Sequence, residues 1–477
     1  MSNTQKIPSN TPDTPGNTPN SPNNTQNTPN TPQNPPKVGI DRITFATPNC
    51  YLSMKDLAIA RGIDPNKFII GIGQSQQAVP PNHQDIVTLG AQAALPLMPY
   101  IDSSRLKMVI VGTESGVDAS KSSALYIHKL LNLSEWVRCV EVKEACYGGT
   151  AALMMACDYV LAHSGAQVLV IAADIARYGV GTPGEVTQGA GAVAMLVSEN
   201  PRVLQINNDS VVKSAEIQDF WRPVYQSTAL ARGKFSTEQY IRMFCDVWQK
   251  YSAENDYNFN DFEAICFHLP YTKMGLKALR AGFEANSGVS HACDGVSITS
   301  DTRERLLARY QDSTQYSRRI GNIYTGSLYL GLISLLDYDY FRNSCDSSES
   351  AGDSPAITGD SSVAGDSSSA THPNESPLRP SPLLPGQKIG LFSYGSGAVA
   401  EFFSATLVPG WRSALFSNQH IKALNNRTQL SVSQYEEMFN SAAPYSPQDF
   451  VSSKENRSGA LFVLDSIKSQ ERNYRSI

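Results

Sequence analysis

The chain has 477 residues, of which 41% are hydrophobic, and its formal net charge is −5. This length is sufficient for two core-forming domains or for two fused halves of one domain. The acidic balance and the lack of a concentrated basic run argue against electrostatic recognition of nucleic acid, so no nucleic-acid partner is expected.

The eight cysteines form no Cys-x-x-Cys pair, and several lie inside apolar runs. This usage is typical of reduced thiols inside a cell rather than of a disulfide framework or a zinc site. The N-terminus has no apolar signal-peptide core. No apolar run approaches the length of a membrane span, because Asp158 interrupts the best one. The sequence therefore predicts a soluble, cytoplasmic protein without a membrane partner.

The first 36 residues repeat Asn-Thr-Pro and its variants and contain almost no apolar side chains. Such a segment cannot bury enough surface to offset the entropy of ordering, so we expect residues 1–36 to be a disordered tail. Beyond it, buried strands are predicted at 107–113, 167–173 and 191–197, and a helix at 120–131. Continuous apolar strands that alternate with helices indicate an α/β sheet covered on both faces.

The second half of the chain repeats this layout, with a strand at 263–267, a helix from about Thr272 and an apolar helix at 327–336. A Ser/Asp/Gly/Pro-rich segment at about 343–385 accounts for the longer spacing in the second copy. We interpret the layout as an internal duplication, and this segment as a surface insertion. The duplication predicts two halves, 37–208 and 209–477, and a second insertion is expected at about 285–298.

The stretch 140–156 predicts a short strand, a tight turn and an apolar helix, with Cys146 at the turn. The free N–H groups and the dipole at a helix N-terminus favour a thiolate at this position. Gly148 and Gly149 remove side chains next to the sulfur, which would let a substrate approach the backbone. The helix is apolar nearly all round, so we expect it to be buried. The alternative is that Cys146 is a small core hydrophobe.

Two further reactive side chains follow predicted buried strands. Glu114 comes after the strand 109–113, and His268 comes after the strand 265–267. Because open α/β sheets place their sites at strand ends, these side chains are expected to converge with Cys146. A thiolate that holds an acyl group, a carboxylate that removes an α-proton and an imidazole beside a carbonyl suit covalent acyl chemistry. Taken singly, Glu114 could be a solvated loop acid and His268 a core histidine.

Other motifs do not point to a second chemistry. The sequence has neither a His-Glu-x-x-His motif nor a Walker loop. The run from Gly395 to Ala400 matches the dinucleotide pattern Gly-x-Gly-x-x-Ala, but no acidic residue closes a further strand about twenty residues on. We therefore expect no nucleotide site there and no bound metal.

Three separated motifs, 143–150, 321–329 and 391–397, resemble the signatures of 3-hydroxy-3-methylglutaryl-CoA (HMG-CoA) synthases, and the bacterial type more than the animal type. The resemblance runs from about Val38 to beyond Tyr435, apart from the two insertions. It implies a thiolase-like α/β fold, in which two duplicated halves form five α-β-α-β-α layers, and a homodimer.

The resemblance also implies roles for individual residues. Cys146 matches the acylated nucleophile, Glu114 the general acid/base, and His268 the residue that polarises the acetoacetyl carbonyl. Substrate-binding positions are matched by Tyr178, Thr187, Asn322 and Ser396 in the pocket, and by Asp64, Ser236, Lys273 and Lys277 along the CoA-linked part. The two lysines lie one turn apart and share a helix face, which could equally be a solvated face. Val186 stands where many relatives have proline.

The implied reaction condenses acetyl-CoA with acetoacetyl-CoA and water to give HMG-CoA, as in the mevalonate pathway to isoprenoid precursors, and needs no metal or redox cofactor. Two alternatives remain open at this stage. One is the same chemistry on acyl-carrier-protein substrates, as in β-branching during polyketide assembly. The other is a non-catalytic scaffold subunit that resembles a condensing enzyme.

Overall fold

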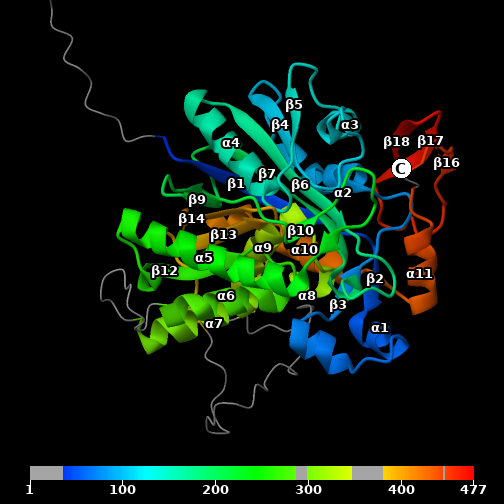
Figure 1. Cartoon of the computed structure of the whole chain (residues 1–477). Helices are drawn as coiled ribbons and strands as arrows, with labels where there is room; N and C mark the ends of the chain where they lie inside the picture. Colours follow the sequence, from blue (N-terminus) through cyan, green and yellow to red (C-terminus); the bar gives the residue numbers. More distant parts are fainter. Residues whose placement is uncertain (1–35, 286–297, 346–379, 444–445) are drawn as a thin grey trace, which may run out of the picture. The chain divides into compact units, whose positions relative to one another are not determined.

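The structure, a computed structural model, describes residues 36–285, 298–345, 380–443 and 446–477 (Figure 1). The predicted tail, almost all of the second predicted insertion and most of the first therefore lie outside the described residues. Residues Pro36–Ile477 form one compact unit, so the two predicted halves are not separate bodies.

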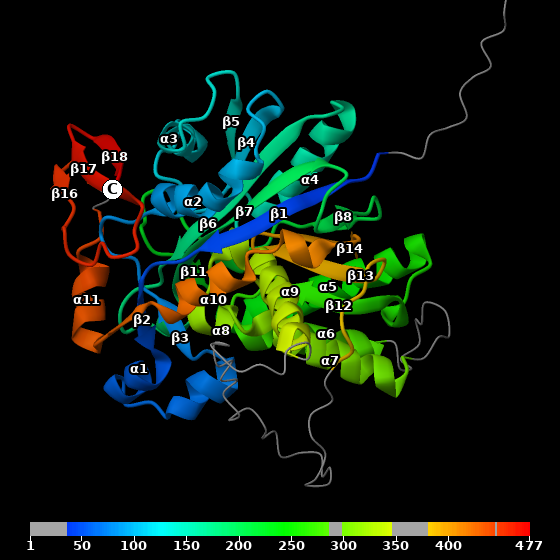
Figure 2. The ribbon, with the colours of Figure 1, turned by 180° about the vertical axis from the view of Figure 1, so that it is seen from behind.

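A mixed sheet of ten strands runs through the described residues in the order β12-β13-β14-β8-β1-β7-β6-β4-β5, with β9 paired to β14. Its strands are β1 (Val38–Ala46), β4 (Leu106–Gly112), β5 (Arg138–Val142), β6 (Gln167–Ala176), β7 (Gly189–Glu199), β8 (Leu204–Ile206), β9 (Val211–Ser214), β12 (Phe262–Phe267), β13 (Lys388–Gly395) and β14 (Val399–Leu407). Figure 2 shows β1 beside β7, with which it pairs antiparallel.

The two ends of this sheet repeat one pairing scheme. In the first half, β4 pairs with β6 in parallel and β6 with β7 antiparallel. In the second half, β12 pairs with β13 in parallel and β13 with β14 antiparallel. The helix that precedes the middle strand of each set is apolar: α4 (Gly148–Ala162) before β6 and α9 (Ser327–Cys345) before β13. The repeated layout that the sequence suggested is thus present in the topology.

Side chains that alternate along the strands divide the first half into layers. Val168 and Val170 of β6 pack in a cluster with α4 and α9. Leu169 and Ile171, which point the other way, pack in a second cluster with α2 (Ile86–Ala94) and α3 (Ser123–Leu130). This alternation is the two-residue period of a strand that is buried on both faces.

The second half shows the same alternation. Ala264 and Cys266 of β12 join the cluster around α4 and α9. Ile265 and Phe267 join a third cluster with α5 (Gly233–Asn255), α6 (Thr272–Ala285) and α7 (Ser300–Thr314). Helices α4 and α9 therefore lie between the two halves of the sheet, and other helices cover both outer faces (Figure 1). This is the layered α-β-α-β-α arrangement that the resemblance implied.

Shorter elements complete the fold. They are β2 (Cys50–Ser53), β3 (Gln76–Ala78), β10 (Phe220–Trp221), β11 (Leu230–Ala231), β15 (Thr428–Leu430), β16 (Phe450–Val451), β17 (Phe462–Lys468), β18 (Glu471–Ser476), α1 (Met54–Ala60), α8 (Ser317–Ile320), α10 (Ser417–Asn425), α11 (Val432–Asn440) and the turns η1 (Lys67–Ile72), η2 (Leu95–Tyr100), η3 (Glu185–Thr187), η4 (Phe259–Asp261), η5 (Tyr324–Gly326) and η7 (Trp411–Ala414). Strands β15, β2 and β3 form one small sheet, and β16 to β18 form another.

Helix α4 differs from its prediction in two respects. It is not buried all round, because Met155 is 53% exposed and Leu161 is 45% exposed. Among the described residues, the window Ala145–Ala162 also has the length and mean hydropathy of a membrane span, so the expectation that no run is long enough was wrong. Half of this window is buried inside the fold, where it packs with the strands of the first half. Its apolar composition is thus accounted for by core packing.

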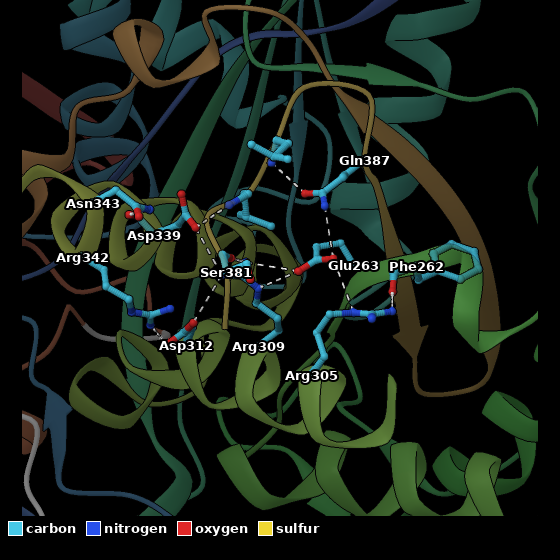
Figure 3. Close-up of polar contacts among 12 residues, drawn as sticks. Phe262, Glu263, Arg305, Arg309, Asp312, Asp339, Arg342, Asn343, Ser381 and Gln387 are labelled. Atoms are coloured by element: carbon cyan, nitrogen blue, oxygen red, sulfur yellow. Dashed lines mark hydrogen bonds and ion pairs between the residues drawn. The ribbon is translucent and has the colours of Figure 1, made fainter. Parts of the chain in front are cut away.

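A buried arginine makes polar contacts with segments on both sides of residues 346–379 (Figure 3). Arg309 of α7, which is fully buried, contacts Glu263 and Asp339 at 3.2 Å each and donates to the carbonyl of Ser381. The N–H of Leu383 donates to Asp339 at 2.8 Å. Because buried guanidinium groups need such partners, these contacts hold both ends of the predicted insertion in the fold. Its boundaries at 343 and 385 were therefore too wide: α9 continues to Cys345, and Leu383 belongs to the core.

Candidate active site

The turn that bears Cys146 follows β5 and leads into α4, as the sequence predicted. Ala145 has a φ of 43°, which a residue with a side chain rarely adopts, so the turn stores backbone strain. Cys146 is 8% exposed, and its thiol donates to Oε1 of Glu114 at 3.2 Å. Glu114 lies two residues after the end of β4, whose parallel partner is β5. The sheet thus brings together two residues that are 32 positions apart.

The two glycines of the motif, Gly148 and Gly149, lie against other backbone. A Cβ at Gly149 would lie 2.5 Å from the carbonyl oxygen of Thr325, a distance that Cβ atoms essentially never show, and one at Gly148 would lie 3.1 Å from that of Val142, which is tight. The glycines therefore allow α4 to pack closely against the η5 turn and β5. That they also let a substrate approach the backbone stays a prediction.

The expected thiolate is also absent from the resting site. Burial, and then the neighbouring Glu114, raise the pKa of the Cys146 thiol well above its ordinary value. The helix N-terminus does favour an anion, but removing the sulfur from water outweighs this effect. Cys146 is therefore a neutral thiol that is hydrogen-bonded to a base, and it ionises only as its proton is transferred.

Glu114 has the properties of that base. Burial, followed by the charge of Asp174, raises the pKa of the Glu114 carboxyl to about 8, although the Cys146 thiol and Arg222 act in the opposite direction. A carboxyl group with this pKa can both accept and return a proton near neutral pH, which general acid–base catalysis requires. The reading of Glu114 as a solvated loop acid is thus disfavoured.

Asp174 fixes the position of Glu114, and the sequence analysis missed it. Its fully buried carboxylate accepts from the backbone N–H groups of Glu114 and Ser115 at 2.9 Å each and from the hydroxyl of Thr113 at 2.9 Å. Its other oxygen accepts from the backbone N–H and the hydroxyl of Thr325, which lies in the second half of the chain. A single acidic residue inside the apolar strand β6 was the available signal.

His268 lies at the end of β12, next to β13, and is 2% exposed. Its backbone N–H donates to the carbonyl of Phe392 at 2.8 Å, and its carbonyl accepts from Tyr240 at 2.6 Å. Burial lowers the pKa of the imidazole to about 3, so the ring is neutral at physiological pH. A neutral imidazole can donate one hydrogen bond to a carbonyl oxygen but does not supply an imidazolium proton.

Strand β13 links the two halves of the site. A Cβ at Gly395, the last residue of β13, would lie 2.7 Å from the backbone nitrogen of Tyr147 and 2.6 Å from the carbonyl oxygen of Glu144. The end of the strand beside His268 therefore rests directly against the Cys146 turn. The structure thus brings the ends of β4 and β5 together at the Cys146 turn, whereas the convergence of His268 with Cys146 stays a prediction.

An aromatic cluster covers the thiol. Cys146 packs with Ala176 and Tyr324, against Tyr178 and Phe220. The three rings contact one another edge to face, with centroids 5.8 to 6.3 Å apart. Such T-shaped contacts are favourable, and they leave the sulfur little contact with bulk water.

Asn322 lies beside this cluster, in the turn before α9. Its side-chain oxygen accepts from the N–H of Tyr324 at 2.9 Å and from the hydroxyl of Ser327 at 3.0 Å. The predicted pocket residues Tyr178 and Asn322 therefore do lie close to Cys146, whereas the hydroxyl of Thr187 donates back into its own turn, to Gly184, at 2.9 Å.

A cavity of about 990 Å³ opens beside the catalytic turn. Its wall includes Glu114, Ala145, Phe220 and Ser396. Ser396 therefore faces the same space as Glu114, from the loop after β13. The cavity is large enough for the acyl end of a thioester substrate.

Asp219 organises the loop that carries Ser396, and no sequence pattern marked it. Its carboxylate is fully buried and accepts from the N–H of Gly397 at 3.0 Å and from the hydroxyl of Tyr394 at 2.8 Å. It also accepts from the hydroxyl of Ser236 at 3.2 Å. Ser236 is thus connected to the Ser396 loop through Asp219.

The remaining predicted binding residues lie elsewhere, at the junction of α6 and η1. The hydroxyl of Thr272, the first residue of α6, donates to the carbonyls of Ile72 and Gly73. Lys273 is half-buried beside this contact, and Lys277 is exposed and donates to the hydroxyl of Tyr271 at 3.1 Å.

Asp64 is exposed and accepts from the N–H of Asn66, just before η1. Neither this aspartate nor the two lysines line the cavity beside Glu114. Within the described residues, no group of three or more His, Cys, Asp or Glu side chains is arranged to hold a metal ion. That the reaction needs no cofactor stays a prediction.

Comparisons with known proteins agree with this geometry. Residues 34–201 match the family model for the N-terminal part of hydroxymethylglutaryl-coenzyme A synthase. The chain is 45% identical over 402 residues to the hydroxymethylglutaryl-CoA synthase of Enterococcus faecalis, covering 84% of this chain and 91% of that protein. It is 30% identical over 419 residues to the polyketide biosynthesis 3-hydroxy-3-methylglutaryl-ACP synthase PksG of Bacillus subtilis, covering 84% of this chain and 87% of that protein.

A solved structure of an HMG-CoA synthase complexed with CoA matches with a TM-score of 0.79 and 38% identity, over 92% of this chain and 100% of that chain. The thiolase-like fold and the resemblance to the bacterial type are thereby confirmed. An identity of 45% that extends over nearly the whole length of a bacterial synthase settles the relationship, and the chain belongs to the hydroxymethylglutaryl-CoA synthase family.

Proposed function

We propose that this protein condenses acetyl-CoA with acetoacetyl-CoA and water to give HMG-CoA and CoA. The observation that carries the proposal is the hydrogen bond from Cys146 to Glu114, a nucleophile joined to a base whose pKa is about 8. The 45% identity to the Enterococcus faecalis synthase supports this choice of substrates.

In the first step, the sulfur of Cys146 attacks the carbonyl carbon of acetyl-CoA. Glu114 accepts the thiol proton and returns it to the departing CoA sulfur, so that an acetyl thioester and free CoA result. The direct contact between the two side chains supports this proton path.

In the second step, Glu114 removes a proton from the acetyl methyl group, and the resulting carbon attacks the ketone of acetoacetyl-CoA. Neutral His268 donates a hydrogen bond to the ketone oxygen, on which negative charge develops, and backbone N–H groups near Cys146 and in the Ser396 loop add to this stabilisation. Each such donor typically contributes about 3 kcal/mol. The former ketone oxygen takes up the proton that Glu114 holds and becomes the 3-hydroxyl group. Water then hydrolyses the Cys146 thioester, which releases HMG-CoA and regenerates the thiol.

The binding residues are assigned as part of the same proposal. Tyr178, Asn322 and Ser396 surround the reacting acyl groups, and Ser236 is linked to the Ser396 loop through Asp219. We assign the α6–η1 junction, with Asp64, Lys273 and Lys277, to the CoA arm, and Thr187 to the wall of the pocket. No metal or redox cofactor takes part in the proposed steps.

Steady-state turnover tests the substrates. With acetyl-CoA and acetoacetyl-CoA the protein is expected to form HMG-CoA, measured by mass spectrometry of the product. The second candidate, which the 30% identity to PksG favours, predicts turnover of acetyl and acetoacetyl groups on acyl-carrier protein only. A scaffold would acquire no acetyl group on Cys146. Either of these results contradicts the proposal.

The pH dependence of condensation should report Glu114. The carboxylate is the active base, and because its pKa is raised to about 8 it is mostly protonated below that pH. The rate of condensation is therefore expected to rise with pH through about 8. Acetylation removes the thiol donor that lowers this pKa, so the inflection for the acetyl-enzyme should lie at or above that value. Single-turnover rates of the preformed acetyl-enzyme measure it, and a rate that falls with pH would contradict the assignment.

We also propose that the protein is a homodimer in the cytoplasm. Strand β5 lies at the end of the sheet order, with one edge unpaired among the described strands, and Trp136 beside it is 91% exposed. An open edge next to an exposed aromatic ring fits a second copy of the chain. Sedimentation velocity measures the mass in solution. Six of the cysteines, namely Cys50, Cys139, Cys146, Cys157, Cys245 and Cys266, are free thiols, which supports a reducing compartment.

A further inference from the structure

The residue after the nucleophile makes a contact that the mechanism does not use. The hydroxyl of Tyr147 donates to Oε2 of Glu401 at 2.7 Å. Glu401 lies on β14 in the second half of the chain and is 3% exposed. Burial raises the pKa of its carboxyl group, and the hydrogen bond from Tyr147 opposes this effect. A hydrogen bond to a buried carboxylate is stronger than one between neutral groups.

A second contact lies one turn further along α4. The hydroxyl of Thr150 donates to the hydroxyl of Ser393 on β13 at 2.7 Å. In the register of the sheet, Ser393 is the direct partner of Glu401. The start of α4 is thus attached at two points to one pair of strands, and His268 is bonded to the same strand β13 through Phe392.

The turn before Tyr147 needs such support. Ala145 is strained, and Tyr147 itself makes no side-chain hydrogen bond that would cap α4. Strained backbone persists only where the surrounding structure holds it. Glu114 reaches Cys146 from the first half, so it sets the distance for proton transfer but not the distance to His268 in the second half.

We propose that Tyr147 and Glu401 are a positioning pair, which holds the Cys146 turn against β14 and so places the acetyl group opposite the ketone beside His268. This inference rests on the proposed function. It predicts an uneven effect on the two chemical steps. Acetylation draws its reacting protein groups from the first half alone, whereas condensation needs the two halves in register.

The test uses the Tyr147→Phe and Glu401→Gln variants of the full chain. Tyr147→Phe removes one hydroxyl and keeps the ring, and it is expected to slow condensation by the acetyl-enzyme on the order of 10 to 100-fold, since a small misplacement of reacting groups has effects of that size. The rate of acetylation should stay within about threefold of wild type. Glu401→Gln keeps an acceptor oxygen and should condense faster than Tyr147→Phe, whereas Glu401→Ala should match Tyr147→Phe.

Tyr159→Phe is the matched control, because Tyr159 lies on the same helix, where its ring stacks on His163. It should leave both steps unchanged. The inference is overturned if Tyr147→Phe condenses within about twofold of wild type, or if acetylation falls as much as condensation. Wild-type protein that forms no HMG-CoA would instead refute the proposed function, so the two failures are distinguishable.

Discussion

A Cys146→Ser variant is expected to form no acetyl-enzyme and to lose turnover by a factor on the order of 10⁴ or more, the scale seen when a covalent nucleophile is removed. A serine hydroxyl at this position would still face Glu114, but its proton is held far more tightly than that of a thiol. With a pKa of about 8, the Glu114 carboxyl is too weak a base to compensate. Intact-protein mass spectrometry after incubation with acetyl-CoA measures the loss.

Cys139→Ser is the matched control for this experiment. Cys139 is a half-buried residue that lines the cavity beside Glu114, and its thiol donates to the carbonyl of Val137 at 3.8 Å rather than to a carboxylate. This variant should acquire the acetyl group as wild type does. Normal acetylation of Cys146→Ser, or loss of the label in Cys139→Ser alone, would show that residue 146 is not the nucleophile.

A Glu114→Ala variant is expected to acetylate and yet fail to condense. The charge of Glu114 and its hydrogen bond both raise the pKa of the Cys146 thiol, so the truncation makes the thiolate easier to form and compensates for the lost proton acceptor. Removal of the methyl proton has no such compensation. Loss of a general base of this kind typically lowers a rate by about 10²- to 10⁴-fold. Acetylation is followed by mass, and condensation by the appearance of HMG-CoA.

Glu216→Ala provides the comparison for Glu114→Ala. Glu216 is an exposed carboxylate that lines the same cavity, so its removal changes the local charge without touching the thiol. This variant should carry out both steps at rates near wild type. If Glu114→Ala could not be acetylated at all, the easier ionisation of the thiol would not compensate for the lost proton acceptor, and the expected separation of the two steps in this variant would be wrong.

The aromatic rings that cover Cys146 keep water away from its sulfur and also restrict the approach of a substrate to it. Tyr178, Phe220 and Tyr324 exclude water from the sulfur, which keeps the thiol neutral and protects a thioester there from early hydrolysis. The same rings restrict the approach of a substrate. Tyr324 also lines one neighbouring cavity, and Phe220 lines another. The cover explains why burial, rather than the helix dipole, governs the state of the nucleophile.

Local patterns were sufficient for most of the elements and for choosing the three candidate residues. The apolar runs that become β4, β6 and β12 have the length and composition of buried strands, and Glu114 and His268 follow two of these runs directly. Since strand ends lie at the edge of a sheet, their convergence could be inferred without coordinates. The 343–385 boundaries failed because low-complexity composition does not reveal that Leu383 is buried or that Ser381 is bound by Arg309.

The sequence by itself thus determined the alternation of strands and helices and the repeated layout, because these depend on the order of neighbouring residues, and it indicated Cys146, Glu114 and His268 as candidate site residues. Only the tertiary structure decided the charge state of the Cys146 thiol and which buried carboxylates hold the site residues in place. Asp174, Asp219 and Glu401 act through partners that are far away in the chain. Burial depends on what every other segment contributes, and no local pattern contains that sum.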